Sequence, residues 1–159
     1  MEIEIRSVVY DDEVGALLEA EGLPNADLQA YAEVVKLDYA EPRPLVELYG
    51  ARYNDELQGL VGLEYYGDVA LLRSLVVRRE LRCSGSGRSL VLFAEQQALR
   101  SGAQALYLLT TTAADYFTRL GFSTLPRDEA PAAIAASQQF SDLCPSSASF
   151  MTKALRRPV

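Results

Sequence analysis

One stretch constrains the fold of this 159-residue chain more than any other. Residues 69–77 (VALLRSLVV) are almost wholly apolar, as expected of a strand that is buried on both faces of a sheet. A glycine-containing turn, residues 82–88 (RCSGSGR), follows this run. Apolar residues then recur at helical spacing from about residue 87 to 101, until Gly102 offers a helix stop. The sequence therefore predicts a strand, a turn and a helix in close succession.

The turn between this strand and this helix has the features of an anion-binding site. Gly85 and Gly87 let a ligand approach the backbone closely, and the first N–H groups of a helix have no partner within it. The helix dipole adds positive potential at the same place. Four of the chain's 13 arginines lie in or just before the turn: Arg78, Arg79, Arg82 and Arg88. A small anionic ligand is the expected occupant.

Composition narrows the chemistry that such a site could support. The chain has no histidine, which excludes a Ser-His-Asp triad, a Cys-His pair and an imidazole metal site. Its two cysteines, Cys83 and Cys144, are too few for a four-cysteine zinc site, and no metal is expected. The net charge of −7 argues against a nucleic-acid partner, because binding phosphate backbones requires a basic surface.

Length and hydropathy favour a single cytoplasmic domain. A chain of 159 residues fits one domain, so residues 1–159 are expected to fold as a unit. No apolar run reaches about 18 residues, and a membrane span is therefore not expected. The first residues, MEIEIRSVVYDDE, are acidic and alternating, which is not the pattern of a signal peptide.

The remaining periodicity predicts a mixed α+β sheet. Strands are expected at 2–6, 45–53, 57–66, 105–110 and 148–154, in addition to 69–77, and another is expected to start at Phe122. Helices are expected after Asp11-Asp12, from 25 to about 35, at 113–120 and at 130–137. The strands at 45–53, 57–66 and 69–77 follow one another through short turns, which indicates antiparallel hairpins. A helix separates 69–77 from 105–110, which indicates a crossover to a parallel strand.

The turn and its surroundings resemble those of the GNAT family of N-acetyltransferases. Residues 82–87 fit the Arg-x-x-Gly-x-Gly pattern that follows an apolar strand in that family and holds the acyl-CoA pyrophosphate. A second match, Ala-x-x-x-Phe-x-x-x-Gly-Phe, follows at residues 113–122. The resemblance implies a GNAT-like fold, a mixed and mostly antiparallel sheet of about six or seven strands, flanked by about four helices and splayed at its central strands.

The resemblance also implies acetyl-CoA as co-substrate and an acyltransferase activity. The backbone of Leu75, Val76 and Val77 would face the acetyl carbonyl and the pantetheine arm. The residues that would hold the pyrophosphate are Arg82, Cys83, Ser84, Gly85, Ser86, Gly87 and Arg88.

The catalytic groups depart from the family pattern. Many members carry a tyrosine, which protonates the leaving thiolate, where this chain has Phe117, so Phe117 would only contact the cofactor. Tyr116 is a second candidate acid, but one residue rotates a helical side chain by about 100°, so it is expected to point elsewhere. Water or a substrate group is the alternative.

Two charged residues on the expected strands have two interpretations each. Glu64 could act as the base that deprotonates the acceptor, directly or through water, or it could be an exposed strand residue. Tyr65 is an alternative base. Arg73 interrupts an apolar run and must be paired there, either with a substrate carboxylate or with an internal glutamate.

The expected acceptor is the amine of a small molecule, an amino acid or an amino-acid-like toxin. The C-terminal third also resembles a subfamily of these enzymes that is associated with arsenic resistance, although two cysteines exclude a three-thiolate arsenic sensor. A non-catalytic CoA-binding or regulatory module and a protein acetyltransferase are the alternative functions. Dimerisation through the C-terminal strand is common in the family, so the resemblance suggests a homodimer as one possible partner state.

Overall fold

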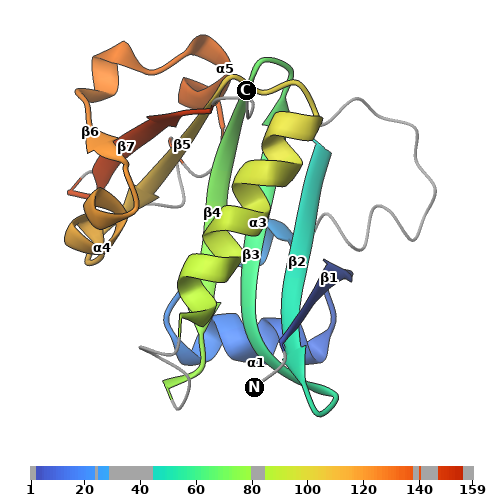
Figure 1. The fold of residues 1–159 in the computed structure, drawn as a ribbon. Coiled ribbons are helices and arrows are strands. Elements are labelled where there is room, and N and C mark those ends of the chain that lie inside the picture. The colour runs from blue at the N-terminus through green and yellow to red at the C-terminus, as the bar shows by residue number, and fades with distance from the viewer. Residues whose placement is uncertain are drawn as a thin grey trace.

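Seven strands form one mixed sheet in the order β1-β2-β3-β4-β5-β7-β6 (Figure 1). The computed structural model describes residues 3–23, 25–28, 45–79, 85–137, 140 and 147–155. The strands are β1 Glu4–Val8, β2 Leu45–Tyr53, β3 Glu56–Tyr66, β4 Val69–Val77, β5 Ala105–Thr110, β6 Ser123–Thr124 and β7 Ser149–Ala154. The helices are α1 Asp12–Ala20, α3 Ser86–Arg100, α4 Ala114–Arg119, α5 Ala132–Ala135 and the 3-10 turn η2 Arg127–Glu129. Among the described strands only β4 and β5 pair in parallel, so the predicted mixed, mostly antiparallel sheet is confirmed.

Local signals place the ends of several elements. Asn54 and Asp55 have φ values of 51° and 62°, the left-handed conformation that a tight hairpin turn requires between β2 and β3. Asp11 begins α1 because its carboxylate accepts a hydrogen bond of 2.9 Å from the backbone N–H of Val14. Gly102, with φ of 100°, follows the end of α3. These turn and cap residues explain why strand and helix bounds follow the sequence pattern closely.

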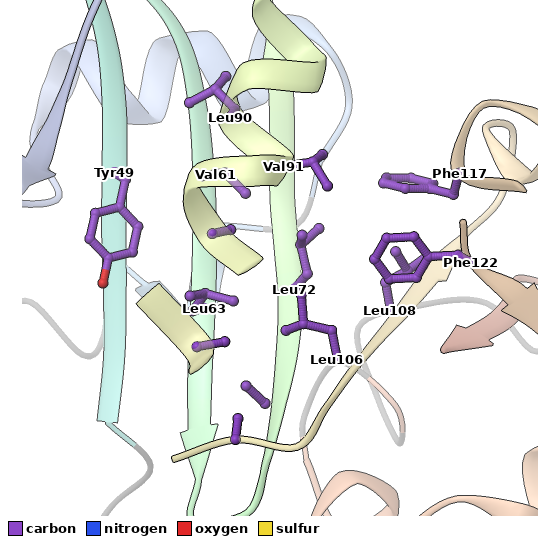
Figure 2. Packing of buried hydrophobic residues seen from close by; sticks show 14 of the residues in the cluster. Tyr49, Val61, Leu63, Leu72, Leu90, Val91, Leu106, Leu108, Phe117 and Phe122 are labelled. Atoms are coloured by element: carbon purple, nitrogen blue, oxygen red, sulfur yellow. The ribbon is translucent and has the colours of Figure 1, made fainter. Parts of the chain in front are cut away.

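The sheet is covered by different helices on its two faces. Helix α3 lies across β2, β3 and β4, and Leu90 and Val91 pack on Val61, Leu63 and other buried side chains of this core (Figures 1 and 2). Helix α1 lies on the opposite face and buries its apolar stripe in a second cluster: Val14, Leu17, Leu18, Leu28, Leu48, Leu57, Leu60 and Val76. The strands at the centre are therefore buried on both faces, as the apolar run at 69–77 predicts.

Strands β4 and β5 separate soon after they pair. Their parallel ladder joins only residues 69–71 of β4 to residues 105–107 of β5, and the two strands then diverge (Figure 1). Among the described strands, the second half of β4 therefore pairs with β3 on one side, and the β5 ladder does not extend along its other side. This is the predicted splay at the central strands.

Some expected bounds differ from those found. The first strand is shifted two residues, and α5 covers four residues rather than the expected 130–137. Phe122 does not begin a strand; it is buried in the core, and β6 is only two residues long. Of the helix expected at 25–35, residues 26–28 are helical and the rest lies outside the described residues. Within the described part of the chain, no helix is long and apolar enough to cross a membrane.

Candidate active site

A cavity of about 690 Å³ opens beside the second half of β4, where β5 has diverged. Four parts of the chain form its walls: the end of β4, the start of α3, the segment around α4 and the residues that follow α1. The lining residues are Glu21, Leu23, Leu75, Val76, Val77, Gly85, Gly87, Arg88, Thr112, Ala113, Tyr116 and Arg119. The structure thus brings the apolar strand, the glycine turn and the later helix to one site.

The edge of β4 presents backbone hydrogen-bonding groups to this cavity. The backbone N–H of Arg78 donates to the carbonyl of Gln58 in a bond of 2.8 Å, so it points toward β3. Successive N–H groups of a strand point to opposite sides, and the N–H of Val77 therefore points away from β3, toward the gap that β5 leaves. This edge of β4 lines the cavity at Leu75, Val76 and Val77.

The start of α3 supplies a second set of donors. Gly85 is the N-cap, and its φ of 88° and ψ of 0° lie in the left-handed region that favours glycine. Ser86, Gly87 and Arg88 begin the helix, and their N–H groups belong to the first turn, which lacks partners within the helix. No atom lies within 4 Å of where a Cβ of Gly85 would be, so a ligand has room to reach the backbone. Arg82, Cys83 and Ser84, which complete the predicted turn, lie outside the described residues, as does Cys144.

The two neighbouring aromatic residues of α4 have different environments. Tyr116 lines the cavity, and its hydroxyl lies 2.5 Å from where a Cβ of Gly87 would be, so the absence of that Cβ makes room for the phenol. Phe117 is 5% exposed and packs edge-on against Phe122, on the side of the core that faces Val91 (Figure 2). As predicted, the two side chains point in different directions. The expectation that Phe117 contacts the cofactor and Tyr116 points elsewhere is corrected, because Tyr116 lines the cavity and Phe117 is buried in the core.

Burial sets the protonation of this phenol. Desolvation raises the pKa of Tyr116 above its ordinary value of 10, and the positive charge of Arg88 lowers it by less. The hydroxyl therefore keeps its proton at neutral pH, which is the state that a proton donor requires.

Glu64 and Arg73 are bound to each other away from the cavity. The side chain of Arg73 is fully buried, and its Nη1 lies 2.8 Å from Oε2 of Glu64. The same guanidinium also binds both carboxylate oxygens of Asp27. Glu64 is 4% exposed, so its interpretation as an exposed strand residue is wrong. Of the two interpretations of Arg73, the structure has the internal carboxylate pair, and this guanidinium is not available as a fork for a substrate carboxylate.

The cavity contains one cation that the sequence patterns did not single out. Arg119 lies three residues after Tyr116 on α4, a spacing that places both side chains on the same helix face. The spacing would have revealed Arg119 if Tyr116 had been assigned to the cavity. By contrast, Arg78 is held by the carbonyl of Leu57 at 2.7 Å, and Arg79 lies 3.7 Å from the Glu21 carboxylate. Arg88 and Arg119 are the two described arginines that line the cavity.

These features fit acyl-CoA better than a bare phosphate. The N-terminus of α3 and Arg88 suit a pyrophosphate, since unpaired N–H groups and positive charge bind phosphate oxygens. The edge of β4 suits an amide-containing arm such as pantetheine, which can pair with a strand as a peptide would. Leu23, Leu75 and Ala113 give the remaining wall an apolar character.

Solved structures of other proteins share this fold. The N-acetylglutamate synthase from Neisseria gonorrhoeae, complexed with coenzyme A and N-acetyl-glutamate, has a TM-score of 0.77 at 19% identity. The match covers 99% of this chain and 36% of the synthase, so this chain spans about a third of that protein.

Two further structures match over nearly their whole length. Rv2747 from Mycobacterium tuberculosis, in complex with CoA and NLQ, has a TM-score of 0.72 at 20% identity, with 96% of this chain and 99% of that one covered. The PaiA N-acetyltransferase from Thermoplasma acidophilum, in complex with coenzyme A, has a TM-score of 0.64 at 17% identity, with 97% and 99% covered. These likenesses show a shared fold.

The family itself is shown by the sequence. The model of the acetyltransferase (GNAT) family matches residues 12–122, which run from the start of α1 through the glycine turn to Phe122. Because this match covers most of the chain and includes every described residue that lines the cavity, the chain belongs to the acetyltransferase (GNAT) family of acyltransferases.

Proposed function

We propose that this protein is an acetyl-CoA-dependent N-acetyltransferase that transfers an acetyl group directly to the amine of a small molecule. One observation carries the proposal: the edge of β4 from which β5 diverges and the N-terminus of α3 open on the same cavity. A strand edge and a helix N-terminus together match a ligand that has an amide arm at one end and a pyrophosphate at the other.

The chain's own groups have distinct parts in binding. The N–H groups of Ser86, Gly87 and Arg88 would bind the pyrophosphate, and the Arg82–Ser84 segment would complete this site by its sequence pattern. The backbone of the β4 edge at Leu75, Val76 and Val77 would face the acetyl carbonyl and the pantetheine arm, where strand N–H groups can stabilise the negative charge that develops on the carbonyl oxygen. Acetyl-CoA supplies the activated acetyl group when it is bound.

Tyr116 is the group that we assign to proton donation. When the C–S bond breaks and the new C–N bond forms, the sulfur accepts the electron pair and needs a proton. Tyr116 lines the cavity and keeps its phenolic proton at neutral pH, because burial raises its pKa. The hydroxyl beside Gly87 can pass that proton to the departing sulfur.

The proton lost by the amine has a different destination. Oε2 of Glu64 accepts from Arg73, and Oε1 accepts from the Tyr66 hydroxyl, so both carboxylate oxygens are already bound. Tyr65 is also bound, since its hydroxyl lies 2.8 Å from that of Tyr49. We therefore assign the amine proton to water in the cavity rather than to Glu64.

The acceptor class follows from fewer observations. The Neisseria synthase was solved with N-acetyl-glutamate, an acetylated amino acid, which supports amino acids as the first acceptors to test. The C-terminal sequence supports an amino-acid-like toxin related to arsenic resistance as a second class. A cytoplasmic location and a homodimer formed through β7 belong to the same proposal.

The test is acetyl-CoA turnover against a panel of amines, read as free thiol release, together with the thermal shift produced by CoA. Turnover of an amino acid or a small amine, with a CoA-dependent thermal shift, is the expected result. A thermal shift without turnover on any amine would instead identify a non-catalytic CoA-binding module. Turnover confined to lysine-containing peptides would identify a protein acetyltransferase, and the absence of any thermal shift would overturn the cofactor assignment.

A further inference from the structure

A buried ion network lies directly before the edge of β4 that lines the cavity. Nη2 of Arg73 lies 2.8 Å from Oδ1 of Asp27, and Nη1 binds the other oxygen of the same carboxylate and Glu64. The Tyr66 hydroxyl donates to the second oxygen of Glu64. The network joins three segments: the residues that follow α1, strand β3 and strand β4. Its planar, bidentate geometry is specific to a guanidinium.

The network adjoins an irregularity in β4. Leu60 pairs with Val76 and Gly62 pairs with Arg73, so one residue of β3 lies opposite two residues of β4. Ser74 is one of these two, and its φ of 58° is unfavourable for a residue with a side chain. Nε of Arg73 lies 3.2 Å from the Ser74 hydroxyl oxygen, to which it donates. The strained residue is therefore bonded to the fixed guanidinium beside it.

The extra residue decides which groups of β4 face the cavity. Before the bulge, Leu72 belongs to the core beneath α3. After it, Leu75 and Val77 pack against this same core, whereas Val76 belongs to the cluster beneath α1. If side chains had alternated regularly from Leu72, Val76 would lie beneath α3, and Leu75 and Val77 would lie beneath α1. The extra residue shifts the strand by one position and so moves each later side chain to the other face of the sheet. The bulge therefore also determines which N–H groups point toward the gap beside β5.

The opposing strand is shaped to admit the Arg73 side chain. A Cβ at Gly62 would lie 3.1 Å from Cγ of Arg73 and 3.1 Å from Cδ2 of Leu48, which is tighter than ordinary contact. Gly62 thus leaves the space through which the arginine stem reaches Asp27.

We propose that Arg73 is a positioning residue: its bonds to Asp27, Glu64 and Ser74 hold the bulge of β4 and so set how the strand edge at residues 75–77 faces the cavity and the acetyl group within it. This inference rests on the proposed function for its catalytic consequence. Asp27 follows Leu23, which lines the cavity, so the same guanidinium also joins the wall after α1 to β4. The groups at the start of α3 that we assign to pyrophosphate binding are not among the partners of Arg73 in this network.

The test replaces Arg73 with lysine, which keeps the charge and loses the planar fork. We expect kcat to fall by about tenfold or more, since a small misplacement of a reacting group is costly, while the CoA dissociation constant stays within about threefold. Amide hydrogen exchange at Val76 and Arg78 should quicken in the variant without any ligand. Arg6→Lys is the matched control, because Arg6 is 72% exposed and pairs with Glu4 on the far edge strand.

A second, milder variant keeps the inference testable if Arg73→Lys fails to fold. Ser74→Ala leaves the three charges in place and removes only the hydroxyl that Nε of Arg73 contacts, so we expect a smaller fall in kcat and faster exchange at Val76. If both variants keep the wild-type kcat and exchange rates, Arg73 has no positioning role. If the wild type neither binds CoA nor turns over any amine, the proposed function fails. The amide exchange rates at Val76 and Arg78 still test whether Arg73 stabilises the bulge, because they are measured without any ligand.

Discussion

Replacing Gly85 with glutamate is expected to weaken CoA binding by roughly 10- to 100-fold, since charge-assisted hydrogen bonds are worth about 1.5–3 kcal/mol. Gly85 caps α3 at a φ of 88°, and the space around it is open. A glutamate would bring a carboxylate to the place where we assign the pyrophosphate. Like charges would then meet at the helix N-terminus, where an anion is otherwise favoured.

The chain offers a matched control for this substitution. Gly102 has a φ of 100° and open space around it, but it lies at the other end of α3. Gly102→Glu therefore carries a similar conformational penalty, of about 1 kcal/mol, without touching the cavity. Calorimetric titration of CoA into both variants makes the comparison. Equal affinity in the two variants would show that the start of α3 does not hold the cofactor.

The second large effect concerns the phenol of α4. Replacing Tyr116 with phenylalanine is expected to lower kcat by about 100-fold, which is typical of the loss of a general acid, with little change in the KM for acetyl-CoA. The ring would keep its contact with Phe117, so stability should hardly change. Tyr53→Phe, on an exposed tyrosine at the end of β2, controls for the loss of any phenol. Initial rates at saturating acetyl-CoA give the result.

Gly87 allows the same claim to be tested without removing the hydroxyl. A Cβ at this position would lie 2.5 Å from the Tyr116 oxygen, and only the phenol tip needs to move. Gly87→Ala should therefore displace the hydroxyl and lower kcat. In the Tyr116→Phe background the same substitution should cost little more. Additive losses in the double variant would mean that Gly87 acts independently of Tyr116, and the proton-donor assignment would lose its geometric support.

The sequence predicts the strands around the site because their signals are local. The apolar run at 69–77 and the turn at Asn54-Asp55 identify β4 and the β2–β3 hairpin directly, and both expected strand ranges 45–53 and 69–77 are those found. Gly85 and Gly87 mark the helix start by their residue type alone. These features depend on neighbours in the chain, and no tertiary contact is needed to recognise them.

The arrangement of the catalytic groups depends on contacts that sequence patterns do not contain. Arg73 pairs with Asp27, which lies 46 residues away, so no local pattern links them. The bulge at Ser74 interrupts an apolar run that contains no glycine, and its effect on which side chains face the cavity appears only when β3 and β4 are paired. The family position points to Phe117, and helix rotation alone predicts that Tyr116 points elsewhere, whereas the absence of a Cβ at Gly87 leaves the space that the Tyr116 hydroxyl occupies.

The most direct test of the central claim is the map of backbone amide shifts on addition of CoA to the ¹⁵N-labelled protein. If the edge of β4 and the start of α3 hold the cofactor, the largest shifts will fall at residues 75–77 and 85–88, with a third set near Tyr116. A larger hollow of about 930 Å³ lies between β1 and the β2–β3 hairpin, around Arg6 and Arg52. Shifts concentrated at that hollow, or none at all with saturating CoA, would contradict the account.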